Sequence, residues 1–330
     1  MTQVTTRPEA RASKEPVTLR VTEVRDEAEG IRSFELREPQ GHDLAPFEAG
    51  AHLPIEVELP DSRTALRYYS LLGDQRDRRR YRIAVLLEPM SRGGSRLMHE
   101  HVSQGSTLRA HAPENGFPLI GADHSILIAG GIGITPILSM VRTLEQQGRS
   151  YELHYAARTP ARMAFREEVG AFRGGQTHLY FTHVDRPDTI DLEGLFATAK
   201  SEASVYVCGP PGLIRAVTSM GDHVGWPMNR IHVESFGPTQ HDGDRSIDVY
   251  LARSALTVQV AAGDTILDAI LRAGVWAPYE CRRGNCATCM TQVISGEPDH
   301  RDVCLTEALR ETYMCTCVSR ARSGHLTLDL

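Results

Sequence analysis

Residues 281–289 read Cys-Arg-Arg-Gly-Asn-Cys-Ala-Thr-Cys and set three cysteines in a C-x4-C-x2-C pattern. A further cysteine follows in the segment Cys317-Val318-Ser319-Arg320-Ala321. A [2Fe–2S] cluster needs four thiolate ligands, and this spacing lets one loop surround most of the cluster while a distant cysteine completes it. The pattern therefore predicts an iron–sulfur site with Cys281, Cys286, Cys289 and Cys317 as its metal ligands.

Two other interpretations of these cysteines stay open. A C-x2-C pair also suits zinc, for which Cys315 and Cys317 would have to supply the second pair. The cysteines could also be free core thiols, although three of them in one polar loop are not typical of a core. Iron–sulfur is favoured because Gly284 and the small residues around it let backbone N–H groups approach the cluster sulfides. On that interpretation Cys304 and Cys315 are not ligands.

The residues before this loop predict two short strands and a helix. Alternating apolar and polar residues over 247–251 and 256–260 are typical of strands. Asp264 or Thr265 can cap a helix that runs over 265–273 and ends at Gly274. Two strands, a helix and a cysteine loop resemble a plant-type ferredoxin with the β-grasp fold. We therefore expect a ferredoxin domain over residues 246–330.

Length, composition and charge limit the classes of protein to which the chain can belong. Its 330 residues allow two or three domains, and a hydrophobic content of 41% supports a buried core in each. A formal net charge of −6 argues against a nucleic-acid binder. Residues 1–16 are polar, without an apolar run that could serve as a signal peptide or membrane span, so we expect a disordered tail. Seven cysteines, an odd number, fit a reducing cytoplasm better than a secreted disulfide scaffold.

Residues 17–120 predict an antiparallel β-barrel. Turn sequences such as Pro39-Gln40-Gly41 separate short strands expected over 17–24, 31–37, 52–59, 68–72 and 82–87. Arg67-Tyr68-Tyr69-Ser70 combines a cation, aromatic faces and a hydroxyl in one strand. Ser91-Arg92-Gly93-Gly94-Ser95 precedes a helical pattern over 96–102, and glycines at a helix start leave N–H groups available to an anion. Taken alone, the first motif is just as typical of an ordinary strand, and the second is just as typical of an ordinary turn.

Residues 121–237 predict an α/β domain with a parallel sheet. The apolar run 125–129 is typical of a buried strand, and Gly130-Gly131-Ile132-Gly133-Ile134-Thr135-Pro136 leads from it into a helical pattern over 137–147. Strand, glycine turn and helix form the layout that binds a dinucleotide pyrophosphate, although a plain strand–helix turn has the same layout. Further strands are expected over 151–157, 178–183 and 204–208, and an amphipathic helix over 161–172. Residues 238–245 are expected to be a linker.

Taken together, these motifs resemble the ferredoxin-reductase superfamily, whose flavin strand has the pattern Arg-x-Tyr-Ser. The Arg-Gly-Gly-Ser run narrows the resemblance to the phthalate dioxygenase reductase family, which includes vanillate demethylase reductases. In that family the domain order is flavin, nicotinamide, iron–sulfur. The resemblance implies FMN as the flavin and NADH as the coenzyme, with NADPH as the alternative.

The resemblance also implies roles for individual residues. Arg67 would pair with the flavin phosphate, Tyr69 would pack on the isoalloxazine, and Ser70 would hydrogen-bond near its N5. Tyr68 and Ala84 would belong to the same site, and Arg92, Gly93, Gly94 and Ser95 would bind the FMN phosphate. The coenzyme would be bound by Gly130, Gly131, Gly133, Thr135, Pro136, Arg158, Cys208, Gly209 and Pro210. The candidate catalytic residues would be Ser70, Cys208 beside the nicotinamide, and Phe236 as a shield over the flavin. As an alternative, Cys208 is a buried thiol at the end of a strand.

The cofactors define the function that we expect. A hydride carries two electrons, a [2Fe–2S] cluster accepts one, and a flavin converts between them. The chain is thus expected to be a cytoplasmic, monomeric NAD(P)H-dependent reductase that delivers single electrons to a Rieske-type oxygenase, in an aromatic-ring dioxygenase or O-demethylase system. A stand-alone flavin reductase or diaphorase and a non-enzymatic redox sensor are the alternatives. Arg282 and Arg283 depart from the family pattern and are expected to meet carboxylates on the partner, or else to form a solvated pair.

Overall fold

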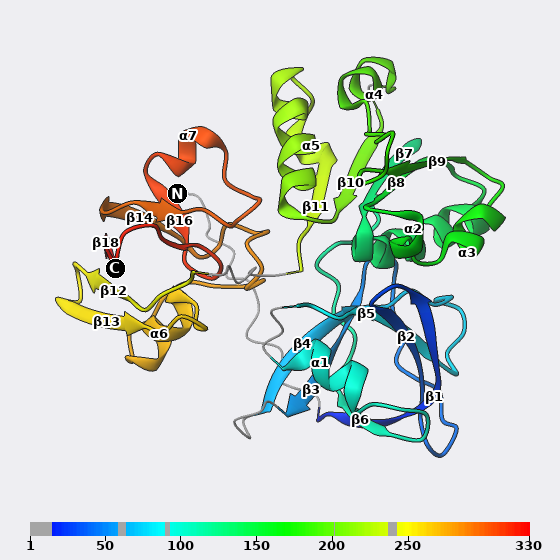
Figure 1. The fold of residues 1–330 in the computed structure, drawn as a ribbon, viewed down its shortest axis with the longest axis horizontal. Helices are drawn as coiled ribbons and strands as arrows, with labels where there is room; N and C mark the ends of the chain where they lie inside the picture. The colour runs from blue at the N-terminus through cyan, green and yellow to red at the C-terminus, as the bar shows by residue number, and fades with distance from the viewer. Residues whose placement is uncertain (1–14, 59–63, 90–92, 201, 237–242) are drawn as a thin grey trace, which may run out of the picture.

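The computed structural model describes residues 15–58, 64–89, 93–200, 202–236 and 243–330. Three domains follow one another along the chain, and each is built around a sheet of its own (Figure 1). The predicted fold class is confirmed in its three parts: an antiparallel β-barrel, a parallel α/β domain and a ferredoxin domain.

The first domain is a six-stranded antiparallel sheet in the order β4-β3-β6-β1-β2-β5. Its edge strands β4 and β5 approach each other, which curls the sheet into a barrel, and α1 packs against β3 and β5. Alternate side chains of β1, such as Leu19 and Val21, are fully buried in the barrel core. The elements are β1 (Val17–Ala28), β2 (Ile31–Arg37), β3 (His52–Glu58), β4 (Thr64–Ser70), β5 (Tyr81–Leu86), α1 (Gly94–Glu100) and β6 (Thr107–Ala110).

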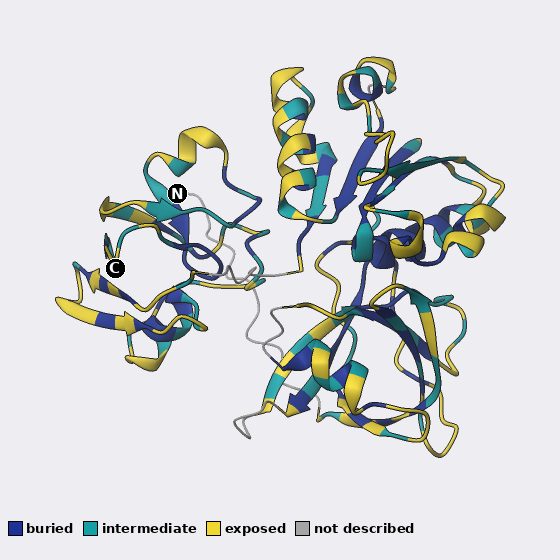
Figure 2. Cartoon of the chain, viewed as in Figure 1, coloured by how far each residue is buried: buried dark blue, intermediate teal, exposed yellow. Residues whose placement is uncertain are grey.

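The second domain has a five-stranded parallel sheet in the order β11-β10-β7-β8-β9. Figure 2 shows that its central strands are buried while the outer turns of α5 are exposed. The strands are β7 (His124–Gly130), β8 (Ser150–Ala157), β9 (Gln176–Phe181), β10 (Ser204–Cys208) and β11 (Ile231–Glu234). The helices are α2 (Ile134–Gln147), α3 (Arg166–Ala171), α4 (Leu192–Thr198) and α5 (Pro211–His223), with the 3-10 turns η1 (Gly131–Gly133), η2 (Pro160–Arg162) and η3 (Met228–Arg230).

The third domain is a mixed sheet in the order β13-β12-β18-β14-β16, in which β12 and β18 are parallel and the other pairs are antiparallel. The strands are β12 (Ile247–Leu251), β13 (Leu256–Val260), β14 (Met290–Ser295), β16 (Tyr313–Cys315) and β18 (His325–Leu328), with the small pair β15 (Pro298–Asp299) and β17 (Arg320–Ala321). The helices are α6 (Ile266–Arg272) and α7 (Glu307–Arg310). Thr265 caps α6, since its side chain accepts a hydrogen bond from the Asp268 amide, so the structure chooses Thr265 over Asp264.

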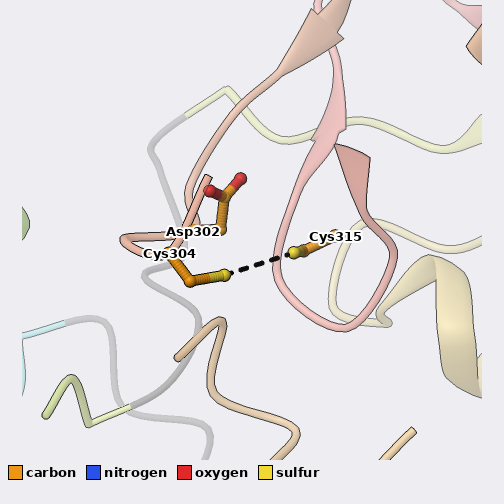
Figure 3. Close-up of side chains that lie close together, drawn as sticks. All are labelled: Asp302, Cys304 and Cys315. Atoms are coloured by element: carbon orange, nitrogen blue, oxygen red, sulfur yellow. Dashed lines mark hydrogen bonds between the residues drawn. The ribbon is translucent and has the colours of Figure 1, made fainter. Parts of the chain in front are cut away.

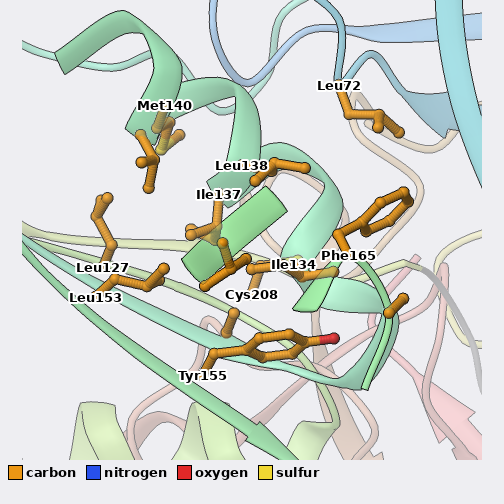
Figure 4. Packing of buried hydrophobic residues seen from close by; sticks show 14 of the residues in the cluster. Leu72, Leu127, Ile134, Ile137, Leu138, Met140, Leu153, Tyr155, Phe165 and Cys208 are labelled. Carbon is orange, nitrogen blue, oxygen red and sulfur yellow. The ribbon is translucent and has the colours of Figure 1, made fainter. Parts of the chain in front are cut away.

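One apolar cluster spans the barrel and the α/β domain, in addition to the cluster inside the barrel. Leu72 of the barrel belongs to the same buried cluster as Ile134, Leu138 and Met140 of α2 (Figure 4). Phe117 of the barrel is part of this cluster too. The ferredoxin domain instead has a core of its own, built from β12, β13, α6 and the strands that follow. Val303 is an exception, because it packs into the apolar cluster of the α/β domain. The first two domains are therefore joined by packing, and the third is attached to them by fewer contacts.

One predicted helix is interrupted. The amphipathic pattern over 161–172 becomes the turn η2 and the shorter helix α3, because Phe165 adopts a left-handed backbone conformation with φ 57°. Burial explains this choice: in that conformation the Phe165 ring enters the core and lies 4.9 Å below the Arg82 guanidinium. Tertiary packing thus overrides the helical periodicity of this segment.

Candidate functional site

A cleft of about 760 Å³ lies where the three domains meet. The barrel contributes β4, from Ala65 to Ser70, together with Ala84 of β5 and Gly94 and Ser95 of α1. The α/β domain contributes Ile132 and Thr135, and Phe236 follows β11. The ferredoxin domain contributes Tyr279, Cys281, Arg282, Arg283 and Cys317. Candidate residues for three different cofactors therefore line one continuous space.

The candidate phosphate site brings β4 and the start of α1 into close contact. A side chain on Gly94 would place its Cβ 2.8 Å from Arg67 Nε, so the arginine crosses the helix directly over this glycine. Gly93 precedes the helix with a positive φ of 97°, which a glycine adopts at little cost. The Ser95 hydroxyl accepts a hydrogen bond from the Glu88 amide. Arg92 lies outside the described residues.

The two glycine turns of the α/β domain pack against each other. A Cβ on Gly130 would lie 2.6 Å from Pro210 Cδ, and one on Gly133 would overlap the Cys208 carbonyl. These two glycines are needed for contact between the turns that follow β7 and β10. Gly131 differs, because it has a φ of 54° and open space where its side chain would be. Both turns lie at the carboxyl ends of adjacent parallel strands, near the point where the strand order reverses, which is where open α/β sheets bind ligands.

The remaining coenzyme candidates surround these turns. The Thr135 hydroxyl is buried and donates to the Ile132 carbonyl, and Pro136 is buried in the first turn of α2. A Cβ on Gly209 would lie 3.0 Å from the Gly130 backbone. Arg158 follows β8 and is exposed. Partial desolvation raises the pKa of the nearby Glu88 carboxyl, and the Arg158 guanidinium opposes this shift.

Cys208 and Glu234 lie side by side at the ends of β10 and β11. Both are buried, and burial raises the pKa of the Cys208 thiol well above its usual value. Burial also raises the pKa of Glu234 to about 7, against the opposing effect of the Arg283 guanidinium. Phe236, two residues later, is 43% exposed and lines the cleft. Sequence reasoning covered Cys208 and Phe236 but assigned no role to Glu234.

The four predicted cluster ligands converge as two contacting pairs. The Cys281 and Cys286 thiols hydrogen-bond to each other, as do those of Cys289 and Cys317. Hydrogen bonds from the Cys315 and Cys317 thiols lower the pKa of Cys289, which favours the thiolate, the form that binds metal. The Arg283 backbone amide donates a hydrogen bond to Cys281 Sγ at 3.4 Å. This set of sulfurs and amides fits a [2Fe–2S] cluster.

The backbone of the cysteine loop is strained where it turns. Arg282 and Ala287 have φ values of 53° and 58°, the left-handed region that side chains other than glycine rarely adopt. Gly284 has a φ of 72°, and a Cβ there would lie 2.7 Å from Val318 Cγ2. The loop thus keeps a costly conformation at two positions among the ligands, Arg282 and Ala287, which is typical of a site that serves function rather than stability.

A second group of possible soft-metal ligands lies beside the cluster cysteines. Figure 3 shows Cys304 and Cys315 pointing toward each other near Asp302, with their sulfurs 3.6 Å apart. The Asp302 carboxylate already accepts hydrogen bonds from the Leu305 amide and the Ser319 hydroxyl and pairs with Arg310. Because that carboxylate is occupied, the group has two available sulfurs only, and the four-sulfur set is the better fit to a cluster.

The two arginines of the loop have different surroundings, which corrects the expectation that they form one partner site. Arg282 is 42% exposed, pairs with Asp268 at 3.2 Å and stacks on the Tyr279 ring, all within the ferredoxin domain. Arg283 is only 13% exposed and contacts the other two domains. Sequence reasoning missed this because both contact residues of Arg283 are distant in the chain.

Comparisons with known proteins agree with this geometry. Residues 249–322 match the model of the 2Fe-2S iron-sulfur cluster binding domain, and residues 127–219 match the oxidoreductase NAD-binding domain. Phthalate dioxygenase reductase of Burkholderia cepacia is 40% identical over 92% of this chain and 94% of its own length. The chain belongs to the phthalate dioxygenase reductase family. The predicted enzyme class, an oxidoreductase, and the predicted cofactors NADH, FMN and a [2Fe–2S] cluster are confirmed for this family member.

A further relative and a solved structure support the same conclusion. Phenoxybenzoate dioxygenase subunit beta of Ectopseudomonas oleovorans is 41% identical over 97% of this chain and 99% of that protein. The solved structure of phthalate dioxygenase reductase, described as modular for electron transfer from pyridine nucleotides to [2Fe-2S], is 39% identical. It matches with a TM-score of 0.74 over 96% of this chain and 98% of that one.

None of the helices in the described part of this chain has the length and apolarity needed to cross a bilayer.

Proposed function

We propose that this reductase passes electrons from NADH through FMN and the [2Fe–2S] cluster to a Rieske-type oxygenase of an aromatic-ring dioxygenase or O-demethylase system. One observation carries the proposal: Ser70 and Phe236 line the same cleft as the cluster cysteines Cys281 and Cys317. When bound, FMN accepts a hydride from NADH and passes the electrons on one at a time. A flavin in that cleft would lie between the nicotinamide site and the cluster.

The flavin site is assigned to β4, β5 and the start of α1. Arg67 and the backbone over Gly93, Gly94 and Ser95 would hold the phosphate, since a guanidinium packed against the amides of a helix start suits a dianion. Tyr69 would pack on the isoalloxazine, and Ser70 would direct its hydroxyl to the ring edge. Tyr68 and Ala84 line the same space. Arg92 belongs to this assignment by the family resemblance alone.

The coenzyme site is assigned to the turns after β7 and β10. Gly131, with open space at its missing Cβ, would let the pyrophosphate approach the backbone, and Gly130, Gly133, Gly209 and Pro210 would hold the two turns together. Cys208 would lie against the nicotinamide, and the half-exposed Phe236 would cover the flavin until the coenzyme displaces it. Thr135, Pro136 and Arg158 would complete the site.

The Gly94–Arg67 contact leads to a prediction about flavin affinity. Alanine at Gly94 must push the Arg67 side chain away, because its Cβ would lie 2.8 Å from Nε. We expect the dissociation constant of FMN to rise about tenfold, which corresponds to roughly 1.4 kcal/mol. Fluorescence titration of the apoprotein measures it. Gly116→Ala is the control, since nothing lies within 4 Å of that position. Equal FMN affinity in the two variants would contradict the assignment of Arg67.

The proposed acceptor is tested by coupled turnover. Purified holoprotein is mixed with NADH, a Rieske-type oxygenase and the substrate of that oxygenase, and product is measured against NADH consumed. We expect product only when all three are present. A panel of aromatic-ring dioxygenases and O-demethylases, with a haem oxygenase as comparison, separates acceptor classes. Product formation with the haem enzyme, and none with any Rieske enzyme, would refute the proposed partner.

The proposal also includes an oligomeric state and a cellular compartment. All three cofactor sites meet in one cleft of one chain, so we propose that the reductase works as a monomer. We place it in the cytoplasm, because thiolate ligands and seven unpaired cysteines suit a reducing compartment. Relatives in this family are named as subunits of oxygenase systems, which implies an oxygenase partner for this chain as well.

A further inference from the structure

Arg283 is the side chain through which the cluster loop contacts both other domains. Its Nη1 lies 3.2 Å from Oε1 of Glu234, at the end of β11 in the α/β domain. Its guanidinium carbon lies 4.6 Å from the centre of the Tyr68 ring, on the flavin strand β4 of the barrel. The side chain of Glu234 is 3% exposed. A single residue from the cysteine loop therefore joins an ion pair on one side to a cation–π contact on the other.

The Glu234 carboxylate depends on this arginine. Its Oε2 is buried and has no hydrogen-bond partner among the described residues, and its Oε1 accepts a hydrogen bond from Arg283 Nη1. Removing one partner of a buried ion pair leaves the other charge uncompensated, which is far more costly than losing an exposed pair. The contact thus resists displacement of the loop in a way that an exposed salt bridge does not.

Further contacts of the described ferredoxin residues reach the α/β domain. The Asn285 side-chain amide donates to the Ser235 carbonyl at 3.4 Å, and Val303 packs into the core of the α/β domain. Asn285 is adjacent to the predicted ligand Cys286, and Arg283 is two residues from Cys281, which lines the cleft. A change in the Arg283 contact therefore moves the cluster ligands directly, without first unfolding the ferredoxin domain.

We propose that Arg283 is a positioning residue that sets the separation of flavin and cluster by clamping the cysteine loop between Glu234 and Tyr68. The proposal rests on the proposed electron path through FMN to the [2Fe–2S] cluster. Electron transfer between two bound centres slows steeply as they move apart, so a loosened loop slows this step specifically. Arg282, adjacent in the chain and equal in charge, contacts Asp268 and Tyr279 inside the ferredoxin domain and sets no such distance.

The test uses full-length holoprotein and the matched variants Arg283→Gln and Arg282→Gln. Each is mixed with NADH without oxygen in a stopped-flow instrument, and loss of flavin absorbance is followed separately from cluster reduction, which is confirmed by freeze-quench electron paramagnetic resonance. In Arg283→Gln we expect the rate of cluster reduction relative to flavin reduction to fall about tenfold, as for residues coupled in one ion-pair network. In Arg282→Gln this ratio should stay as in the wild type.

Two further variants keep the outcome decisive. Arg283→Lys retains the charge but loses the planar group that stacks on Tyr68, so it should recover part of the rate. Glu234→Gln removes the other half of the ion pair, and the double variant with Arg283→Gln should be no slower than Arg283→Gln alone. If Arg283→Gln fails to retain its cluster, Glu234→Gln must show the slowed step by itself.

Iron and FMN contents are measured for each variant, which separates a lost cofactor from a displaced one. Equal rate ratios in Arg283→Gln and Arg282→Gln, with both cofactors bound, would overturn the role of Arg283 and leave the electron path intact. A wild-type cluster that NADH does not reduce at all would instead overturn the proposed function. The two failures are therefore distinguishable in one set of measurements.

Discussion

A chain cut after Gly237 is expected to oxidise NADH and reduce ferricyanide, yet to deliver almost no electrons to an oxygenase. The barrel and the α/β domain share the core of Figure 4, so the fragment 1–237 retains the packing that joins its halves. It also retains every residue assigned to the flavin and coenzyme. A small acceptor such as ferricyanide can take electrons at the flavin, whereas a protein acceptor needs the cluster. Oxygenase-supported turnover should fall about 100-fold or more, a barrier difference of roughly 2.7 kcal/mol.

Adding the ferredoxin domain back as a separate chain should restore little of that turnover. A short tether holds the two modules at an effective concentration near the millimolar range, far above the micromolar concentrations of an assay. The fragment should begin at residue 243 rather than 246, because Arg301 pairs with both oxygens of Asp244, and Arg320 donates to the Arg245 carbonyl. Coupled oxygenase assays of the two fragments, alone and mixed, measure the effect. Undiminished turnover by the fragment 1–237 would remove the cluster from the electron path.

The second large effect is expected from the cysteines. Cys317→Ser should lose most of the iron–sulfur absorbance, since a four-ligand site loses one thiolate, whereas Cys304→Ser should keep it. The contrast is informative because Cys304 lies 3.6 Å from Cys315, which itself contacts the predicted ligand Cys289. Iron, zinc and sulfide per FMN, together with the visible spectrum, give the measurement. Loss of the cluster in Cys304→Ser with survival in Cys317→Ser would reassign the site, and a zinc signal in place of iron would revive the zinc interpretation.

Local features of this chain were predictable from the sequence. The domain order follows from motifs that each occupy a few consecutive residues: the flavin strand at Arg67–Ser70, the glycine turn at Gly130–Pro136 and the cysteine loop. The limits of β10, Ser204–Cys208, were predicted correctly because an apolar run ends at a turn. The cap of α6 was predicted to be Asp264 or Thr265 for the same kind of reason, since a capping side chain acts within one turn, and the structure has Thr265.

Features that depend on distant residues were not predictable. Phe165 leaves the helical conformation for a contact with the barrel, and no periodicity within 161–172 reveals that contact. Gly130 and Gly133 were interpreted as giving access to a pyrophosphate, but their missing side chains first make room for the turn after β10. The role of Arg283 depends on Glu234 and Tyr68, one in each of the other domains. Sequence spacing shows which residues can act together locally, and the fold decides which act together across domains.

The separate core of the ferredoxin domain has a consequence for how the protein can change over generations. A substitution inside that core, for example at Val249 or Leu328, meets neighbours from its own domain and needs no compensating change in the barrel. Substitutions are more restricted at Arg283, Asn285 and Val303, because these side chains contact residues of the other two domains. Mutational drift should therefore be freest within each core and slowest at these three positions. A ferredoxin module recruited from a related gene would have to match them before it could be joined to this flavin module.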